Sequence, residues 1–245
     1  MSNIFFKKSI NLPKIILFGD SLTQRSFDPE SGCWGAYLAN KFQRICDVIS
    51  RGFSGYNTRW CRGVIDQVFS EFNPQYIVCV VIWLGANDAN EPDSYSGQHV
   101  SLEEYRDNLQ YFISYFKNYG IDKDRLIFVT PPPYDHESFA STCVPGEIPN
   151  KSSQLTELYA NECVNVAQKN NITLINIHEE LKKLSNYKQY FLDGLHFNYN
   201  GGKIVYKIVD NFITEKFEKF SNKKFNQNDM IFPYWKDIVN KKIEY

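Results

Sequence analysis

The sequence predicts a single α/β domain, in which a parallel sheet of about five strands is covered by helices on both faces. Five short apolar runs alternate along the chain with longer segments whose apolar residues recur at helical spacing. Such alternation is typical of parallel sheets, because each connecting helix packs back onto the sheet. No internal repeat or low-complexity linker divides the 245 residues, which fits one large domain.

The first half of the chain contains three of the expected strands. Lys14–Phe18 is short and apolar, and Cys46–Ile49 is expected to be the second strand. The third, Tyr76–Leu84, is an unbroken apolar run rich in β-branched residues, as a central parallel strand requires. Trp34–Phe42 and Asn57–Phe72 are expected to be helices, because their apolar residues lie three or four positions apart.

The second half alternates in the same way and begins with a helix that carries a capping box. The Ser101 hydroxyl is expected to accept a hydrogen bond from the Glu104 amide, and Gly120 is expected to end this helix. The remaining strands are expected at Arg125–Thr130 and Ile172–Ile175, and the remaining helices at Ser152–Lys169, Ile177–Leu184 and Gly201–Phe220.

Two segments fall outside this alternation. Residues 134–151 form a loop that is long for a compact domain, so it is expected to be functional or mobile, and its His136 is the non-motif histidine most expected to touch substrate. Residues 221–245 are expected to be a tail that packs through the apolar stretch Met230–Trp235. Contact between two copies of the chain, giving a homo-oligomer, is the alternative for this tail.

Composition and charge restrict the class of protein. The 27 Lys and Arg nearly balance the 28 Asp and Glu, which disfavours a nucleic-acid-binding protein, since these usually carry a basic face. The longest apolar run is far shorter than the roughly 20 residues of a membrane-spanning helix. The N-terminus lacks the apolar stretch of a secretory signal, and the six cysteines include no C-x-x-C pair. We therefore expect a cytoplasmic protein with reduced thiols and no membrane span.

Missing motifs exclude several kinds of site. The sequence contains no phosphate-binding G-x-x-x-x-G-K-[ST], no dinucleotide-binding G-x-G-x-x-G and no zinc-binding H-E-x-x-H. The G-x-S-x-G turn of α/β-hydrolases is also absent. The four histidines of the chain show no metal-ligand spacing. We therefore expect neither a metal nor an organic cofactor.

What remains is a set of residues suited to acyl transfer. Ser21 directly follows the first strand, and ligands of parallel sheets bind beyond the carboxyl ends of the strands. A serine nucleophile needs an adjacent base, and His196 is the candidate. Asp193 precedes His196 by three residues, close enough to hold the imidazole tautomer. The amides of Ser21 and Gly55 and the side chain of Asn87 are the expected donors to the oxyanion.

Four blocks that contain these residues occur in order: Gly19–Leu22 (GDSL), Gly52–Asn57 (GFSGYN), Gly85–Asp88 (GAND) and Asp193–His196 (DGLH). Together they resemble the four blocks of the SGNH (GDSL-type) hydrolases, and the resemblance spans residues 15 to about 215. Three longer segments resemble the isoamyl acetate-hydrolysing esterase branch of that family: Arg51–Thr58, Trp83–Asp88 and Phe232–Asp237.

The resemblance implies a three-layer, flavodoxin-like α/β/α fold and hydrolysis of short-chain acyl esters, with a place in lipid metabolism. By position, Ser21 is the nucleophile, and Asp193 and His196 complete the catalytic triad. Ser21, Gly55 and Asn87 form the oxyanion hole. The implied partner is a small-molecule ester, without nucleic acid, metal or organic cofactor.

Two kinds of alternative remain open. Sugar O-acetyl esterases, thioesterases and lysophospholipases use the same chemistry, and the sequence does not distinguish among them. A catalytically silent α/β module that binds a ligand in the same pocket is the alternative from another class. Taken singly, each residue also has a structural interpretation. Ser21 can cap a helix, Gly55 and Asn87 can shape turns, and Asp193 can pair with His196 at the surface.

Overall fold

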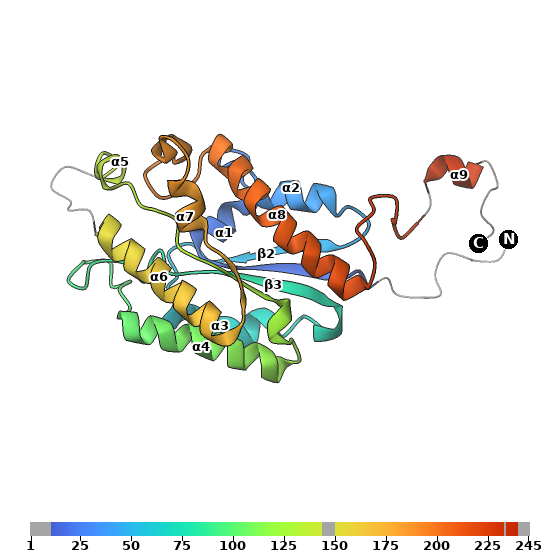
Figure 1. Ribbon diagram of the computed structural model, residues 1–245, viewed down its shortest axis with the longest axis horizontal. Helices are drawn as coiled ribbons and strands as arrows, with labels where there is room; N and C mark the ends of the chain where they lie inside the picture. Colours follow the sequence, from blue (N-terminus) through green and yellow to red (C-terminus); the bar gives the residue numbers. More distant parts are fainter. Residues whose placement is uncertain (1–10, 144–149, 233, 240–245) are drawn as a thin grey trace.

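A computed structural model describes residues 11–143, 150–232 and 234–239, and it confirms the predicted α/β class (Figure 1). Five parallel strands form one sheet in the order β2-β1-β3-β4-β5. They are β1 (Lys14–Gly19), β2 (Asp47–Gly52), β3 (Ile77–Trp83), β4 (Leu126–Val129) and β5 (Thr173–Ile175). The strand order reverses between β1 and β3, which is where ligands bind in open α/β sheets.

Helices cover both faces of the sheet, as the three-layer prediction requires (Figure 1). One layer contains α2 (Trp34–Lys41), α7 (Ile177–Lys182) and α8 (Tyr199–Ser221), and the other contains α3 (Thr58–Phe69), α4 (Leu102–Tyr119) and α6 (Ser153–Asn170). Alternate residues of β1 point to the two layers, with Ile15 and Leu17 in one apolar cluster and Ile16 and Phe18 in the other. Within the described ranges, no helix has both the length and the apolar composition to cross a lipid bilayer.

The strongest local signals are confirmed. Every residue of β3 is buried, as its unbroken apolar run predicts. Ser101 caps α4 by accepting a hydrogen bond from the Glu104 amide at 3.2 Å, and Gly120 ends the helix with a φ of 97°. These elements are well predicted because burial on both faces and helix capping each depend on a short stretch of sequence.

The second strand extends further than predicted. Gly19 of β1 pairs with Gly52, so β2 continues through Arg51 to Gly52 instead of ending at Ile49. Because β2 lies at the edge of the sheet, its residues are half-buried or exposed. Polar side chains are tolerated at such positions, so the apolar run is shorter than the strand.

The segments outside the alternation differ from expectation in detail. The long loop contains a short helix, α5 (His136–Ala140), and residues 144–149 of that loop lie outside the described residues. In the tail, Met230 packs against the core, whereas the large apolar side chains from Ile231 to Val239 are 41–68% exposed. The packing expected of Met230–Trp235 is therefore seen for Met230 and not for Ile231, Phe232, Tyr234 or Trp235. Pro233 lies outside the described residues. Figure 1 shows α9 (Trp235–Val239) projecting from the body.

Candidate active site

A hydrogen-bonded chain of three side chains lies at the carboxyl edge of the sheet. Ser21 is the first residue of α1 (Ser21–Gln24), immediately beyond β1. His196 Nε2 lies 2.8 Å from Ser21 Oγ, and His196 Nδ1 lies 2.6 Å from Asp193 Oδ2. The fold thus brings together the serine, histidine and aspartate that the sequence analysis selected.

The backbone around Asp193 fixes both carboxylate oxygens. Oδ1 accepts hydrogen bonds from the amides of Leu195, at 3.0 Å, and His196, at 2.8 Å, which leaves Oδ2 facing the imidazole. Gly194 has a φ of 86°, and a Cβ there would collide with the carbonyl oxygen of Asp135. Glycine is therefore required at the second position of this turn.

The charge state of Asp193 sets the roles of the two imidazole nitrogens. Burial raises the pKa of Asp193, but hydrogen bonds from the His196 ring and from two amides outweigh it and lower the pKa to about 2. An ionised carboxylate only accepts hydrogen bonds, so Nδ1 of His196 carries the proton in that bond. In the neutral imidazole, Nε2 is then the acceptor that faces the Ser21 hydroxyl.

The loops that carry Gly55 and Asn87 start beside Ser21. Gly19 pairs with Gly52 of β2 on one side and with Trp83 of β3 on the other, so three loops leave the sheet from adjacent strands. Asn87 Nδ2 donates to the Tyr56 carbonyl at 2.9 Å, which ties the loop after β3 to the loop after β2. That bond uses one of the two hydrogens on Nδ2 and leaves the other for a ligand.

Gln98 fastens the same two loops and was not predicted. Its Nε2 donates to the Gly55 carbonyl at 2.7 Å and lies 3.4 Å from Asn87 Oδ1. Gly55 has a φ of 80°, in the left-handed region that favours glycine. No motif in the sequence marks Gln98, because it reaches the site from the irregular segment that precedes α4.

Two aspartates beside these residues make structural contacts. Asp20 caps α1 by accepting a hydrogen bond from the Leu22 amide at 2.9 Å, and Asp88 accepts from the amide and hydroxyl of Thr58, which fixes the start of α3. Both carboxyls are fully buried. Burial raises the pKa of Asp20 to about 7 and that of Asp88 to about 6, against the opposing effect of their hydrogen bonds.

A buried lysine that contacts the loop after β3 was also not predicted from the sequence. Lys151 is 5% exposed, and its Nζ donates to the Ala86 carbonyl at 2.7 Å and to Asn90 Oδ1. Burial lowers the pKa of Lys151 to about 8, with Asp20 and Asp88 opposing that shift. Lysine in a loop is normally solvated, so the sequence gives no sign of this contact. His136 Nδ1 lies 3.3 Å from the Lys151 carbonyl oxygen.

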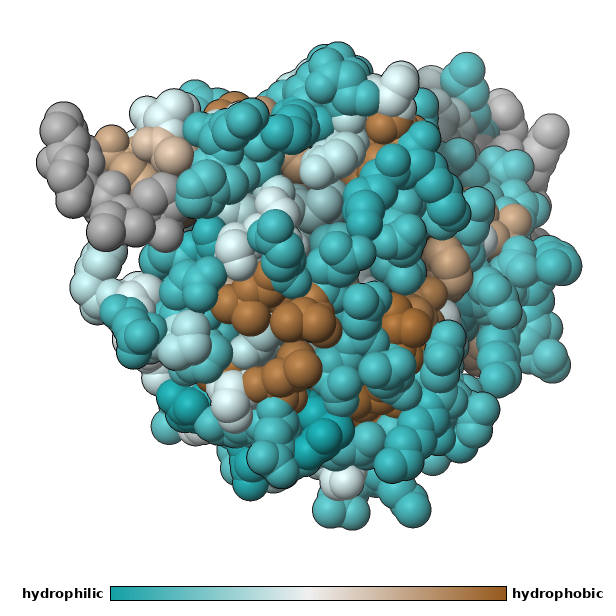
Figure 2. Space-filling model, turned by 60° about the vertical axis from the view of Figure 1, so that its left-hand side comes forward, coloured by the Kyte–Doolittle hydropathy of each residue, from teal (hydrophilic) through white to brown (hydrophobic). Residues whose placement is uncertain are grey.

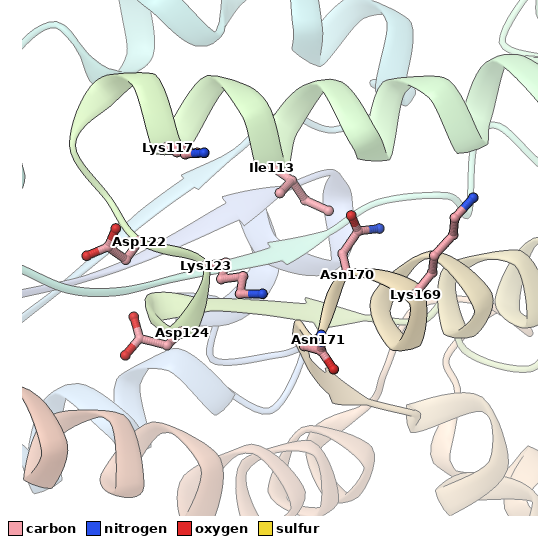
Figure 3. A pocket seen from close by; sticks show the side chains of 8 residues that line it. All are labelled: Ile113, Lys117, Asp122, Lys123, Asp124, Lys169, Asn170 and Asn171. Carbon is pink, nitrogen blue, oxygen red and sulfur yellow. The ribbon is translucent and has the colours of Figure 1, made fainter.

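A small cavity lies beside one of the three hydrogen-bonded side chains. A cavity of about 10 Å³ borders His196 and is lined also by Leu22, Arg25, Ser31, Trp34 and Phe197. Figure 2 brings forward the side on which the strands end, and shows apolar groups in a largely hydrophilic surface. A hollow of about 690 Å³ lies instead between the C-terminal ends of α4 and α6, before β4 begins (Figure 3). It is at the opposite edge of the sheet from Ser21, His196 and Asp193.

One group of side chains has a spacing suited to a metal. Within the part of the chain that the structure describes, ligand atoms of Glu157, His178 and Glu179 lie within 4.8 Å of one another. Lys182 already forms ion pairs with Glu157, at 3.0 Å, and with Glu179, at 3.6 Å. The single charge of Lys182 is thus shared between the two carboxylates, and the expectation of a metal-independent protein stays a prediction.

Comparisons with known proteins give a consistent result. Residues 17–204 match the GDSL-like lipase/acylhydrolase family. A human protein named isoamyl acetate-hydrolyzing esterase 1 homolog is 35% identical over 95% of this chain and 90% of its own length. A GDSL esterase/lipase of Arabidopsis thaliana is 37% identical over 80% of this chain and 83% of its own.

Solved structures share the fold. The lipase/acylhydrolase from Enterococcus faecalis superimposes with a TM-score of 0.64 and 21% identity, covering 82% of this chain and 95% of that one. A catalytic mutant of an acetylxylan esterase from Geobacillus stearothermophilus has a TM-score of 0.60 and 20% identity, over 83% of this chain and 96% of its own. These likenesses confirm the predicted fold of the SGNH hydrolases.

Proposed function

Because the chain belongs to the GDSL-like lipase/acylhydrolase family, we propose that it is a serine esterase that hydrolyses short-chain, acetyl-type carboxylic esters through an acyl-enzyme. The observation that carries this proposal is the chain of hydrogen bonds from Ser21 through His196 to Asp193. A nucleophile, a base and a group that orients the base are the three parts that serine-dependent acyl transfer requires.

In the first half of the reaction, Ser21 Oγ attacks the ester carbonyl carbon while His196 Nε2 takes the hydroxyl proton. The Asp193 carboxylate stabilises the imidazolium that forms. The oxyanion accepts hydrogen bonds from the Ser21 and Gly55 amides and from Asn87 Nδ2. When the tetrahedral intermediate collapses, the ester C–O bond breaks and His196 protonates the departing alcohol. The acyl group remains on Ser21.

The second half uses water in place of the alcohol. His196 Nε2 takes a proton from a water molecule, whose oxygen attacks the acyl carbonyl. The same three donors hold the second oxyanion. The bond from Ser21 Oγ to the acyl carbon then breaks, His196 returns the proton to Oγ, and a carboxylic acid leaves.

Two observations favour a short-chain ester with an apolar alcohol. Exposed apolar side chains flank the triad in sequence: Phe27 at 38% and Leu192 at 52%. The human relative is named for hydrolysis of isoamyl acetate.

The names of structural neighbours support the triad and suggest a second substrate class. Three structures of the Geobacillus acetylxylan esterase are described as catalytic mutants, in which a serine, an aspartate or a histidine is changed to alanine. Its aspartate and histidine are three positions apart, as are Asp193 and His196. Sugar acetates are therefore the second candidate. The family and relatives named lipase or acylhydrolase keep the lysophospholipase alternative open, whereas the thioesterase and silent-binding alternatives have no comparable observation in their favour.

An ester panel tests the proposal. Purified protein is assayed on p-nitrophenyl esters from acetate to decanoate, on acetylated xylose, on an acetyl thioester and on a lysophospholipid. We expect hydrolysis to be fastest for acetate or butyrate and to vanish in Ser21→Ala. Ser54→Ala is the matched control. Ser54 lies in the second block, and its backbone amide, which the substitution keeps, donates to Gln24 Oε1 at 2.8 Å. Equal activity in wild type and Ser21→Ala, or no ester hydrolysis at all, would contradict the proposal.

A further inference from the structure

We infer that Lys151 is a positioning residue for the oxyanion hole, and that its ammonium group holds the loop carrying Asn87. The inference rests on the proposed esterase function. Lys151 is the last residue of the long loop, just before α6, and none of the four sequence blocks contains it. Its side chain nevertheless ends beneath the turn that follows β3.

The ammonium group donates hydrogen bonds to this turn on both sides of Asn87. Lys151 Nζ donates to the carbonyl of Ala86, one residue before Asn87, at 2.7 Å, and to Oδ1 of Asn90, three residues after it. The backbones are joined as well. Asn90 and Lys151 form an antiparallel bridge, and the Glu91 amide donates to the Asn150 carbonyl at 2.7 Å.

The turn itself is short, so its orientation depends on these outside contacts. Internally it is closed by the Ala89 amide bonding to the Gly85 carbonyl at 3.1 Å and by the Asn90 amide bonding to the Asn87 carbonyl at 3.2 Å. The Ala86 peptide directly precedes Asn87, so rotating that peptide turns the Asn87 side chain. Misplacement of a catalytic group by about 1 Å can reduce a rate by about 10²-fold.

The burial of Lys151 is difficult to explain by stability alone. Both of its hydrogen-bond acceptors are uncharged, and taking an ammonium group out of water carries a large desolvation penalty. The charged groups that face it are the buried carboxylates of Asp20 and Asp88, which act on it electrostatically. Asp20 precedes Ser21 and Asp88 follows Asn87, so the two buried carboxyls that act on Lys151 adjoin the nucleophile and the oxyanion donor in the chain.

A double-mutant cycle tests the inference on the full chain. Lys151→Met keeps the length of the side chain and removes its donors. With p-nitrophenyl acetate we expect kcat to fall about 10- to 100-fold and KM to stay within about threefold, because the oxyanion donor acts in the transition state. The double variant of Lys151→Met with Asn87→Ala should be no more than about threefold slower than Asn87→Ala alone, because both changes remove the same interaction.

Lys216 offers a matched control. It is half-buried, donates to the Asp124 carbonyl and to Thr173 Oγ1, and lies where β4 and β5 begin, at the other edge of the sheet. Lys216→Met should lower the melting temperature and leave kcat within about twofold. A Lys151→Met enzyme with wild-type kcat, or a double variant whose loss is the product of the two single losses, would overturn the inference.

A second variant, and the activity of the wild type, separate failure of this inference from misfolding and from failure of the proposed function. If Lys151→Met does not fold, Asn90→Leu is compared with Asn90→Asp. Both lose the Nδ2 donor to Ser96 and Gln98, but only Asn90→Leu also loses the acceptor for Lys151. Relative to Asn90→Asp, Asn90→Leu should lower kcat by a smaller factor than Lys151→Met does, again without adding to Asn87→Ala, and equal kcat in the two Asn90 variants would count against the inference. If wild type hydrolyses ester through Ser21 but Lys151→Met is equally fast, only the role of Lys151 fails. If wild type shows no ester hydrolysis, the proposed function fails first.

Discussion

Replacing Asn87 with alanine separates two interactions made by one side chain. Asn87 Nδ2 donates to the Tyr56 carbonyl at 2.9 Å, and in the proposed mechanism its second hydrogen reaches the oxyanion. The first interaction acts on the stability of the folded protein, whereas the second acts only while the tetrahedral intermediate forms. Kinetics and thermal unfolding of the same variant therefore report on different bonds.

The expected magnitudes differ enough to be distinguished. Removing one side-chain donor from an oxyanion hole costs about 10²–10³ in kcat, or roughly 2.7–4 kcal/mol, in another serine hydrolase. Two backbone amides remain here, so we expect a loss of about 10²-fold or somewhat less, with little change in KM. Loss of the bond to Tyr56 should reduce the free energy of unfolding by about 0.5–1.5 kcal/mol. For a chain of this length that lowers Tm by only a few degrees.

The assay is steady-state hydrolysis of p-nitrophenyl acetate together with a melting curve on each preparation. Asn87→Asp should be slower than Asn87→Ala, because a carboxylate repels the oxyanion. Asn176→Ala is the matched control. Asn176 caps α7 by accepting from the Glu179 amide at 3.2 Å, so its loss should cost about 1 kcal/mol in stability and leave kcat unchanged. If Asn87→Ala melts lower but keeps kcat within a few-fold of wild type, Asn87 only shapes the turn.

The remaining predictions concern the base, the aspartate and metal independence. His196→Ala should lower kcat by orders of magnitude, and wild-type kcat should fall in acid because a protonated imidazole cannot accept the Ser21 proton; a flat profile from about pH 5 to 8 would exclude this role. Asp193→Asn should lower kcat less than His196→Ala does, as measured on the same ester. The pKa of Asp193 is about 2 in the folded protein and 3.8 ordinarily. Its ionised form therefore stabilises the fold above about pH 4, and the gap in Tm between wild type and Asp193→Asn should shrink as the pH falls toward 2. Treatment with a chelator should leave activity intact, and a loss that zinc restores would contradict the expected metal independence.

The predictability of each feature depended on how local its physical cause is. The unbroken apolar run of β3 and the Ser101 cap of α4 are set by neighbouring residues, so both were predicted. The hydrogen-bonded group of Ser21, His196 and Asp193 was also accessible from sequence, because Ser21 follows a strand and Asp193 and His196 share one turn. Parallel strands then bring their carboxyl ends to one edge without further information.

The features that were missed depend on contacts between irregular segments. Gln98 and Lys151 reach the Asn87 loop from two separate loops, and no periodicity or motif fixes where either side chain ends. The extent of β2 was underestimated because pairing with β1, and not apolar content, carries the strand to Gly52. The exposed apolar side chains of the tail, such as Trp235, show the converse, since an apolar stretch alone does not determine what it packs against.

Covalent trapping tests the role of Ser21 most directly. The purified protein is reacted with a fluorophosphonate, digested, and analysed by peptide mass spectrometry, with Ser21→Ala treated in parallel. We predict one adduct per chain on Ser21, loss of esterase activity in proportion to labelling, and no adduct in Ser21→Ala. An adduct on Ser54 or on a cysteine, or full activity in a fully labelled protein, would show that Ser21 is not the nucleophile.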